Sequence, residues 1–297
     1  VEAMCVDVQC IYPSLSHTKQ GFHTKLITTM PEARMEGEHF IRFKEEEAEE
    51  VAGKIIQEAI SAFKNRDANK VFLPKTAPQD LVAGFSVESL LEVLKKINPD
   101  NPLAALIKPI KDGDIQGVAL LAGCLSPKVQ TDMSHVTIAK ELIKNNVLVL
   151  ATGCAATACA RHGLLNSQAE QLAGSSLREV LKILGEKAGL KTSLPPVLHF
   201  GACVDNSRAV VLASALADEL SVSLDQLPLV VSAAESAVEK ATSIYLGATA
   251  FGLTTHIGVM PKIGGSPFIM DTLTKDLEKV TGIKIIIVPK SNLQDIV

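Results

Sequence analysis

The chain has 297 residues, of which 47% are hydrophobic and 21% charged, with a formal net charge of −4 at pH 7. This composition allows a sizeable core, and a weak negative charge spread along the chain argues against a nucleic-acid partner. We find no signal peptide and no apolar run long enough to span a bilayer, so we expect a cytoplasmic protein without membrane spans. The chain begins with Val1 inside an apolar run, and we therefore expect it to be a piece of something longer.

The first part of the chain predicts a small α/β unit. Strands are expected at 1–12, 23–30, 39–43 and 70–74, and a helix at 45–65. The helix carries apolar residues that recur on one face, namely Val51, Ile55, Ile56, Ala59, Ile60 and Phe63. A stretch at 75–84, rich in turn residues, interrupts the pattern. We place the domain boundary there, with a partial first Rossmann-like domain at 1–75 and a second one at 76–297.

Strands and helices alternate through the rest of the chain. Strands are predicted at 117–122, 147–150, 197–200, 227–232, 256–260 and 284–288, and helices at 86–97, 135–145, 176–188, 207–220 and 267–280. We expect Ser86 to cap the first of these helices and Gly189 to end the third. The alternation predicts an α/β fold of two Rossmann-like, doubly wound domains with mainly parallel sheets.

Cysteines follow the ends of several predicted strands. Cys124, Cys154 and Cys203 each come within a step or two of a glycine after an apolar run, and Cys10 ends the first strand. Ligands bind at the carboxyl ends of strands in open α/β sheets. Soft thiolates suit iron–sulfur clusters, zinc and nickel. No C-x2-C pair or tight cysteine run is present, so these thiols could converge only through the fold, around a cluster between domains.

A plainer interpretation exists for each cysteine, because a single buried cysteine is most often an inert small residue. The shared context of three of them favours metal ligands. Cys5, inside a predicted strand, and Cys159, one turn past Cys154, are interpreted as structural.

Lys240 follows another strand end. It could act as an acid–base group beside a metal-bound substrate, although a solvated helix lysine is the commoner case. Asp205, Asn206 and Arg208 are expected to cap the helix after Cys203. The dinucleotide fingerprint, the phosphate-binding loop and the serine-hydrolase motif are all absent from the sequence.

Five segments resemble the catalytic subunit of the nickel-dependent, anaerobic carbon monoxide dehydrogenases, in residues and in spacing. They are VDVQC (6–10), GVALLAGC (117–124), TGCAATACARHGLL (152–165), HFGACVDNSR (199–208) and EKATSI (239–244). The resemblance implies oxidation of CO with water to CO2, two protons and two electrons, at a nickel–iron–sulfur cluster between Rossmann-like domains. It also implies cluster ligands at Cys10, Cys124, Cys154 and Cys203, and an acid–base role for Lys240.

The resemblance covers only the C-terminal part of that subunit. The N-terminal half of the family carries a helical domain, the cysteines of the electron-relaying [4Fe–4S] clusters, and one His and one Cys that complete the active cluster. We therefore expect an incomplete ligand set, no intact cluster and no CO oxidation by this chain alone. Expected partners in the family are a second subunit in a homodimer and a ferredoxin-like electron acceptor, with acetyl-CoA synthase or a hydrogenase as further candidates.

Two other interpretations stay open. A hybrid-cluster hydroxylamine reductase shares the architecture and the cysteines at strand ends, but GACVDNSR favours the first family. A metal-free scaffold or dimerisation fragment would fold without metal and would lose no function on Cys154→Ala.

Overall fold

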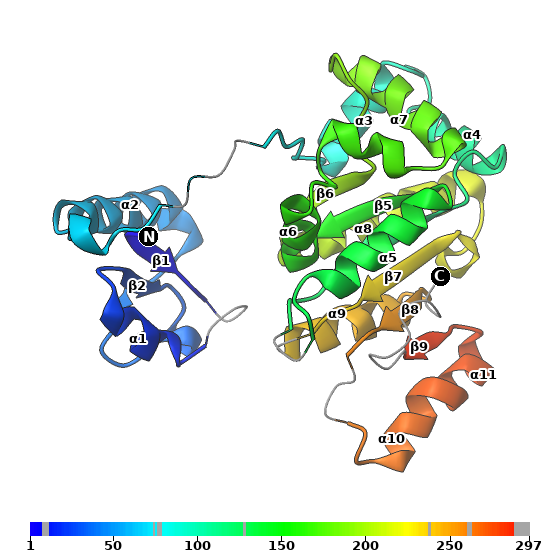
Figure 1. Cartoon of the computed structure of the whole chain (residues 1–297). Helices are drawn as coiled ribbons and strands as arrows, with labels where there is room; N and C mark the ends of the chain where they lie inside the picture. Colours follow the sequence, from blue (N-terminus) through cyan, green and yellow to red (C-terminus); the bar gives the residue numbers. More distant parts are fainter. Residues whose placement is uncertain are drawn as a thin grey trace. The chain divides into compact units, whose positions relative to one another are not determined.

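The computed structural model describes residues 1–7, 12–73, 75, 79–126, 129–236, 239–259 and 263–287. The chain divides into two compact units, residues 1–77 and 78–297. Figure 1 shows both units, coloured from blue at the N-terminus to red at the C-terminus. Both units are α/β and both contain parallel sheets, as the alternation of strands and helices predicted. The domain bounds of 1–75 and 76–297 stay a prediction.

The first unit holds a three-stranded parallel sheet in the order β1-β2-β3. Its elements are β1 (Ala3–Cys5), α1 (Leu15–Thr18), β2 (Lys25–Thr28), β3 (His39–Phe40) and α2 (Ala48–Lys64). The strand predicted at 70–74 is wrong for its described residues. A 3-10 turn, Ala68–Lys70, stands there instead, and Asn69 N–H donates to the Asp67 carboxylate at its start. Phe72 and Leu73 follow it as exposed, irregular chain.

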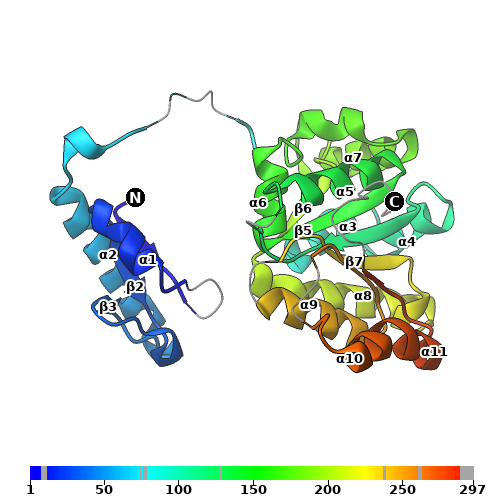
Figure 2. The ribbon, with the colours of Figure 1, turned by 60° about the horizontal axis from the view of Figure 1, so that its bottom comes forward.

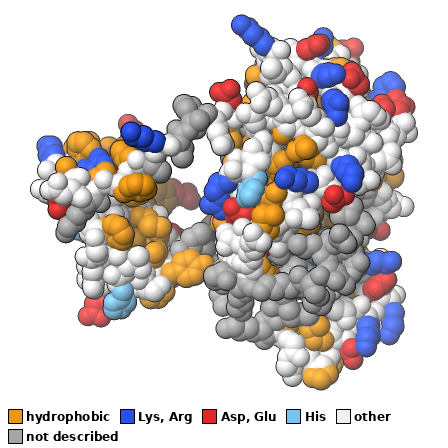
Figure 3. Space-filling model, viewed as in Figure 1, with side chains coloured by type: hydrophobic (Ala, Val, Ile, Leu, Met, Phe, Trp, Pro, Cys, Tyr) orange, Lys and Arg blue, Asp and Glu red, His pale blue; other side chains and the backbone are white. Residues whose placement is uncertain are grey.

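The apolar face predicted for α2 is only partly buried. Val51 is 3% exposed, whereas Ile56 and Phe63 are each 58% exposed. Figure 3 shows hydrophobic side chains gathered on the visible face of this unit. A sheet of three short strands is narrower than the apolar stripe of a 17-residue helix, so part of the stripe has no sheet beneath it.

The second unit is built on a six-stranded, fully parallel sheet in the order β6-β5-β4-β7-β8-β9. The strands are β4 (Gly117–Leu121), β5 (Val147–Thr152), β6 (Val197–Gly201), β7 (Leu229–Ala233), β8 (Thr254–Ile257) and β9 (Ile285–Ile287). Numbered from its first strand, this is the 3-2-1-4-5-6 order of a Rossmann fold. The strand order reverses between β4 and β7, which is where such sheets open a crevice for ligands.

Helices cover both faces of this sheet, with α5 on one face and α8 and α9 on the other (Figure 2). The helices are α3 (Val87–Lys95), α4 (Ala104–Lys111), α5 (Met133–Lys144), α6 (Gly153–Arg161), α7 (Ser175–Ala188), α8 (Asn206–Leu220), α9 (Glu239–Ala250), α10 (Pro267–Asp271) and α11 (Leu277–Thr281). The predicted caps are confirmed. Ser86 Oγ accepts from Ser89 N–H at 3.1 Å, and Gly189 ends α7 with a left-handed φ of 86°.

Candidate functional site

Three of the four candidate ligand cysteines lie at the carboxyl ends of three neighbouring strands. Cys203 follows β6, Cys154 follows β5 and Cys124 follows β4, and these strands are adjacent in the sheet. Neighbouring strands lie about 4.8 Å apart, so three adjacent strand ends span about 10 Å. The fold therefore brings residues that are distant in the sequence to one edge of the sheet, beside the point where the strand order reverses.

Gly153, the residue directly before Cys154, packs against Cys203. Its φ is +54°, and a Cβ placed on it would overlap Cys203 Sγ and lie 3.3 Å from the Cys203 backbone nitrogen. Only glycine leaves room for that sulfur while keeping this backbone conformation. In the structure the space left by Gly153 is filled by the side chain of the second cysteine.

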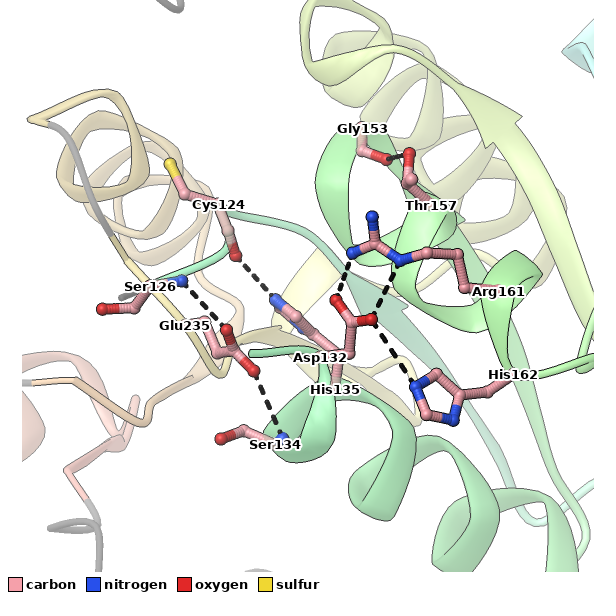
Figure 4. A network of polar contacts seen from close by, with 10 residues as sticks. All are labelled: Cys124, Ser126, Asp132, Ser134, His135, Gly153, Thr157, Arg161, His162 and Glu235. Atoms are coloured by element: carbon pink, nitrogen blue, oxygen red, sulfur yellow. Dashed lines mark hydrogen bonds and ion pairs between the residues drawn. The ribbon is translucent and has the colours of Figure 1, made fainter. Parts of the chain in front are cut away.

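Both backbone groups of Cys124 are held by hydrogen bonds. Its N–H donates to the backbone oxygen of Glu235 at 3.2 Å, and its carbonyl lies 2.8 Å from His135 Nε2. Gly123 (φ +96°) fits against the same Glu235 carbonyl, since a Cβ on it would lie 2.9 Å from that oxygen. Figure 4 shows the Cys124 sulfur pointing away from the carbonyl that His135 contacts.

The side chain of Glu235, and not that of the N-cap residue Asp132, accepts a hydrogen bond from the N-terminus of α5. Its carboxylate is fully buried and accepts from Ser126 N–H at 3.0 Å and from Ser134 N–H at 3.3 Å. Ser134 lies in the first turn of α5, where unpaired N–H groups favour an anion. Asp132 occupies the N-cap position, but its side chain makes no capping bond.

Asp132 instead connects this loop to α6. Arg161 Nε donates to its Oδ2 at 2.9 Å, Arg161 Nη2 contacts its Oδ1, and His162 Nε2 lies 3.5 Å away. The Arg161 guanidinium lowers the pKa of Asp132. Asp132 in turn raises the pKa of Arg161, with smaller contributions from Cys154 and Glu235. Arg161 on α6 therefore pairs with the loop that precedes α5 through Asp132, as Figure 4 shows.

Two buried histidines, His135 on α5 and His256 on β8, lie in this part of the second unit. Burial lowers the pKa of His135, so its ring is neutral, and Nε2 carries the proton because the Cys124 carbonyl can only accept. Burial also lowers the pKa of His256 to about 4, and its Nδ1 lies 2.8 Å from Ser232 Oγ on β7. Both rings are part of the core of this edge and stay uncharged at neutral pH.

Lys240 lies in the first turn of α9, which follows β7. The N-terminus of a helix that follows a strand lies at the carboxyl edge of the sheet, so Lys240 shares this edge with the three cysteines. A cation there opposes the helix dipole, which favours anions at that end. A lysine at this position therefore slightly destabilises α9.

The remaining candidates have different surroundings. Cys10 lies outside the described residues, so its place in the site stays a prediction. Cys5 ends β1 and is exposed. Cys159 is buried in α6, and burial raises its pKa to about 12, which fits a structural role.

The capping of α8 predicted for the residues after Cys203 is confirmed in position only, because none of their side chains makes a capping bond to the helix. Asp205 is the N-cap of α8, but its carboxylate accepts from Ala202 N–H at 2.7 Å instead of bonding within the helix. Asn206 Oδ1 accepts from Thr152 Oγ1 at 2.6 Å, which links α8 to the end of β5, and Arg208 pairs with Glu88.

The donor set fits a cluster better than a single ion. Within the described ranges, no three side chains of His, Cys, Asp and Glu lie in a position to hold one metal ion together. A cluster takes its thiolates on several metal atoms, so its ligands lie further apart than those of one ion. Three thiols on adjacent strand ends, one of them against a glycine backbone, suit an iron–sulfur or nickel–iron–sulfur core.

Sequence reasoning missed Glu235, His135 and Asp132 as parts of this edge. The signal available for Glu235 was a single carboxylate directly after the apolar run LVVSAA. Nothing in the sequence shows that β7 lies beside β4.

The fold and the site define an α/β protein with thiols at the switch point of a Rossmann sheet. Residues 1–291 match the Prismane/CO dehydrogenase family, and the chain belongs to it. Carbon monoxide dehydrogenase 1 of Carboxydothermus hydrogenoformans is 50% identical over 283 residues, which are 95% of this chain and 44% of that protein. Carbon monoxide dehydrogenase of Rhodospirillum rubrum is 47% identical over the same shares of both chains.

Solved structures agree with these relatives. Carbon monoxide dehydrogenase IV from Carboxydothermus hydrogenoformans superposes with a TM-score of 0.89 and 45% identity, over 97% of this chain and 46% of its own. A structure of NiZn[Fe4S4] and NiNi[Fe4S4] clusters in acetyl-CoA synthase/carbon monoxide dehydrogenase gives a TM-score of 0.88 at 42% identity, over 99% of this chain and 44% of its own. The chain spans 44% of the length of the first curated relatives. No helix in the described part of the chain is long and apolar enough to cross a membrane.

Proposed function

We propose that this chain forms the C-terminal part of a nickel-dependent carbon monoxide dehydrogenase. The reaction is the oxidation of CO with water to CO2, two protons and two electrons. The observation that carries the proposal is the placement of Cys124, Cys154 and Cys203 on three adjacent strand ends, with Gly153 against the Cys203 sulfur. The matches to relatives named carbon monoxide dehydrogenase support it.

In this proposal Cys10, Cys124, Cys154 and Cys203 hold a nickel–iron–sulfur cluster, and further ligands come from outside the chain. Such a cluster supplies the metal atoms at which CO and water react. The electron-relaying [4Fe–4S] clusters belong to the N-terminal half of the full-length protein. The proposal includes a cytoplasmic homodimer, a ferredoxin-like electron acceptor, and acetyl-CoA synthase or a hydrogenase as candidate partners.

Lys240 has the acid–base role in this proposal. From the first turn of α9 its ammonium group would donate a hydrogen bond to the negative charge that develops on the substrate oxygen, and would move a proton at Nζ. A neutral side chain of similar length, as in Lys240→Met, removes both abilities.

The test compares two cysteines of the same helix, α6. In the full-length protein, Cys154→Ala is expected to abolish CO-dependent viologen reduction and to lower nickel content, because it removes a ligand. Cys159→Ala is the matched control, since Cys159 is fully buried and its thiol stays protonated. Equal nickel and equal turnover in both variants would refute the assignment of Cys154.

The metal-free scaffold is the alternative that the metal measurements must exclude. It predicts that the full-length protein contains neither nickel nor iron, and that Cys154→Ala leaves its function unchanged. Nickel and iron in the full-length protein would exclude the metal-free scaffold. Reduction of hydroxylamine without oxidation of CO would identify a hybrid-cluster enzyme instead of a carbon monoxide dehydrogenase.

A further inference from the structure

Four hydrogen bonds connect three segments to one another: the chain that follows β7, the start of α5 and the loop that follows β4. The Glu235 backbone oxygen accepts from Cys124 N–H at 3.2 Å, and the Glu235 carboxylate accepts from Ser126 N–H at 3.0 Å and Ser134 N–H at 3.3 Å. His135 Nε2 donates to the Cys124 carbonyl at 2.8 Å. We call Glu235 and His135 together the loop clamp (Figure 4).

The clamp carries an unusual cost for a structural element. A carboxylate with no solvent exposure is expensive to bury unless hydrogen bonds compensate it. Here the compensation comes from two backbone N–H groups, that of Ser126 in the loop after β4 and that of Ser134 in the first turn of α5. The nearer residue, Asp132, could have capped the helix from the N-cap position, yet its side chain pairs with Arg161.

The clamp leaves little freedom to the backbone of Cys124. Its N–H and its carbonyl are both held, by residues from two different elements, while its sulfur points away from the carbonyl contact (Figure 4). With both peptide groups fixed, the sulfur can move only by rotation about the Cα–Cβ bond. A metal ligand must be held close to its productive geometry by the residues around it.

We propose that Glu235 and His135 are positioning residues that hold the Cys124 thiol for cluster binding. This inference rests on the proposed function, because a fixed thiol matters to catalysis only if Cys124 is a ligand. It goes beyond the ligand set, since neither side chain contributes an atom to the cluster.

The first arm of the test does not depend on metal. The metal-free chain is alkylated with iodoacetamide, and the rate at each cysteine is followed by peptide mass spectrometry. Glu235→Gln keeps the shape but puts an amide N–H group against one backbone donor, so we expect Cys124 to react about tenfold faster. Cys203 and the buried Cys159 should react at unchanged rates. Glu141→Gln is the matched control, because Glu141 also lies on α5 but its side chain is 41% exposed and pairs with Lys144.

The histidine gives a second, independent pair of variants. His135→Gln retains an N–H donor that can reach the Cys124 carbonyl, whereas His135→Leu has none. We expect His135→Leu to speed alkylation of Cys124 and His135→Gln to restore much of the protection. If Glu235→Gln also exposes Cys159, the variant has unfolded, and this pair decides the question.

The second arm measures nickel and iron in the full-length protein, together with the electron paramagnetic resonance spectrum of the cluster. Glu235→Gln and His135→Leu should lose most of the nickel, and Glu141→Gln should keep it. Unchanged alkylation of Cys124 in both clamp variants overturns the inference. Faster alkylation with full nickel content also overturns it, while leaving the proposed function intact. Wild-type protein without nickel and iron overturns the proposed function itself.

Discussion

The contact between Gly153 and Cys203 makes a quantitative prediction for Gly153→Ala. Alanine in a left-handed conformation costs about 1–2 kcal/mol, and Gly153 has a φ of +54°. The new Cβ would also overlap Cys203 Sγ, and forcing an extra carbon into a packed site costs about 1–3 kcal/mol. We therefore expect a loss of about 2–5 kcal/mol in the free energy of unfolding.

Gly163, which follows α6, is the matched control. Its φ is +75°, and a Cβ on it meets nothing within 4 Å. Gly163→Ala should therefore cost only the backbone strain, about 1–2 kcal/mol. Urea unfolding of the metal-free chain, followed by circular dichroism, measures both variants, one at the start of α6 and one just after its end.

A double-mutant cycle isolates the sulfur. In a Cys203→Ala background the overlapping atom is absent, so Gly153→Ala should cost about as much as Gly163→Ala. The coupling energy between Gly153→Ala and Cys203→Ala should then be about 1–3 kcal/mol. Equal costs for Gly153→Ala and Gly163→Ala in the wild-type background, or zero coupling, would refute the packing of these two residues.

Two further predictions concern pH. The pKa of His256 is about 4 in the folded chain and 6.5 ordinarily, so its stabilising effect is present above pH 6.5 and is lost as the pH falls toward 4. Unfolding free energy should drop by roughly 2 kcal/mol from pH 7 to pH 5, and His256→Asn should flatten that part of the profile in urea titrations. The pKa of Asp132 lies below its ordinary 3.8, so its pairing stabilises fully above pH 3.8 and is lost as the pH falls through the lowered pKa. Asp132→Asn, which tolerates the φ of 76°, should cost about 1 kcal/mol at pH 7 and progressively less as the pH is lowered below 3.8; a cost that does not change with pH would contradict the pairing.

The strand ends could be predicted from the sequence because the signal is local. An apolar run followed by glycine and cysteine marks where a buried parallel strand stops, and all three such cysteines lie at the carboxyl edge of the sheet. The cap at Ser86 and the helix end at Gly189 are equally local signals.

Long-range pairing is what the sequence could not supply. Glu235 meets Cys124 only because β7 inserts beside β4, and no pattern of apolar residues encodes that neighbour. The helix α4 was not predicted; it continues through Pro109, a residue that normally ends a helix. The described residues of 70–74 have side chains that favour strands, but they pair with no strand in the described part of the first unit. Because strand propensity depends on packing against a neighbouring strand, these residues form irregular chain.

The central place of β4 has a consequence for how the chain is made. During synthesis the strands that precede the three thiols leave the ribosome before β7 does, because β7 comes later in the chain. Until β7 arrives, one edge of β4 is bare and Cys124 has no neighbour at its amide. A metal delivered to the proposed site before that point would meet a sheet without β7 and a Cys124 without its contact to Glu235.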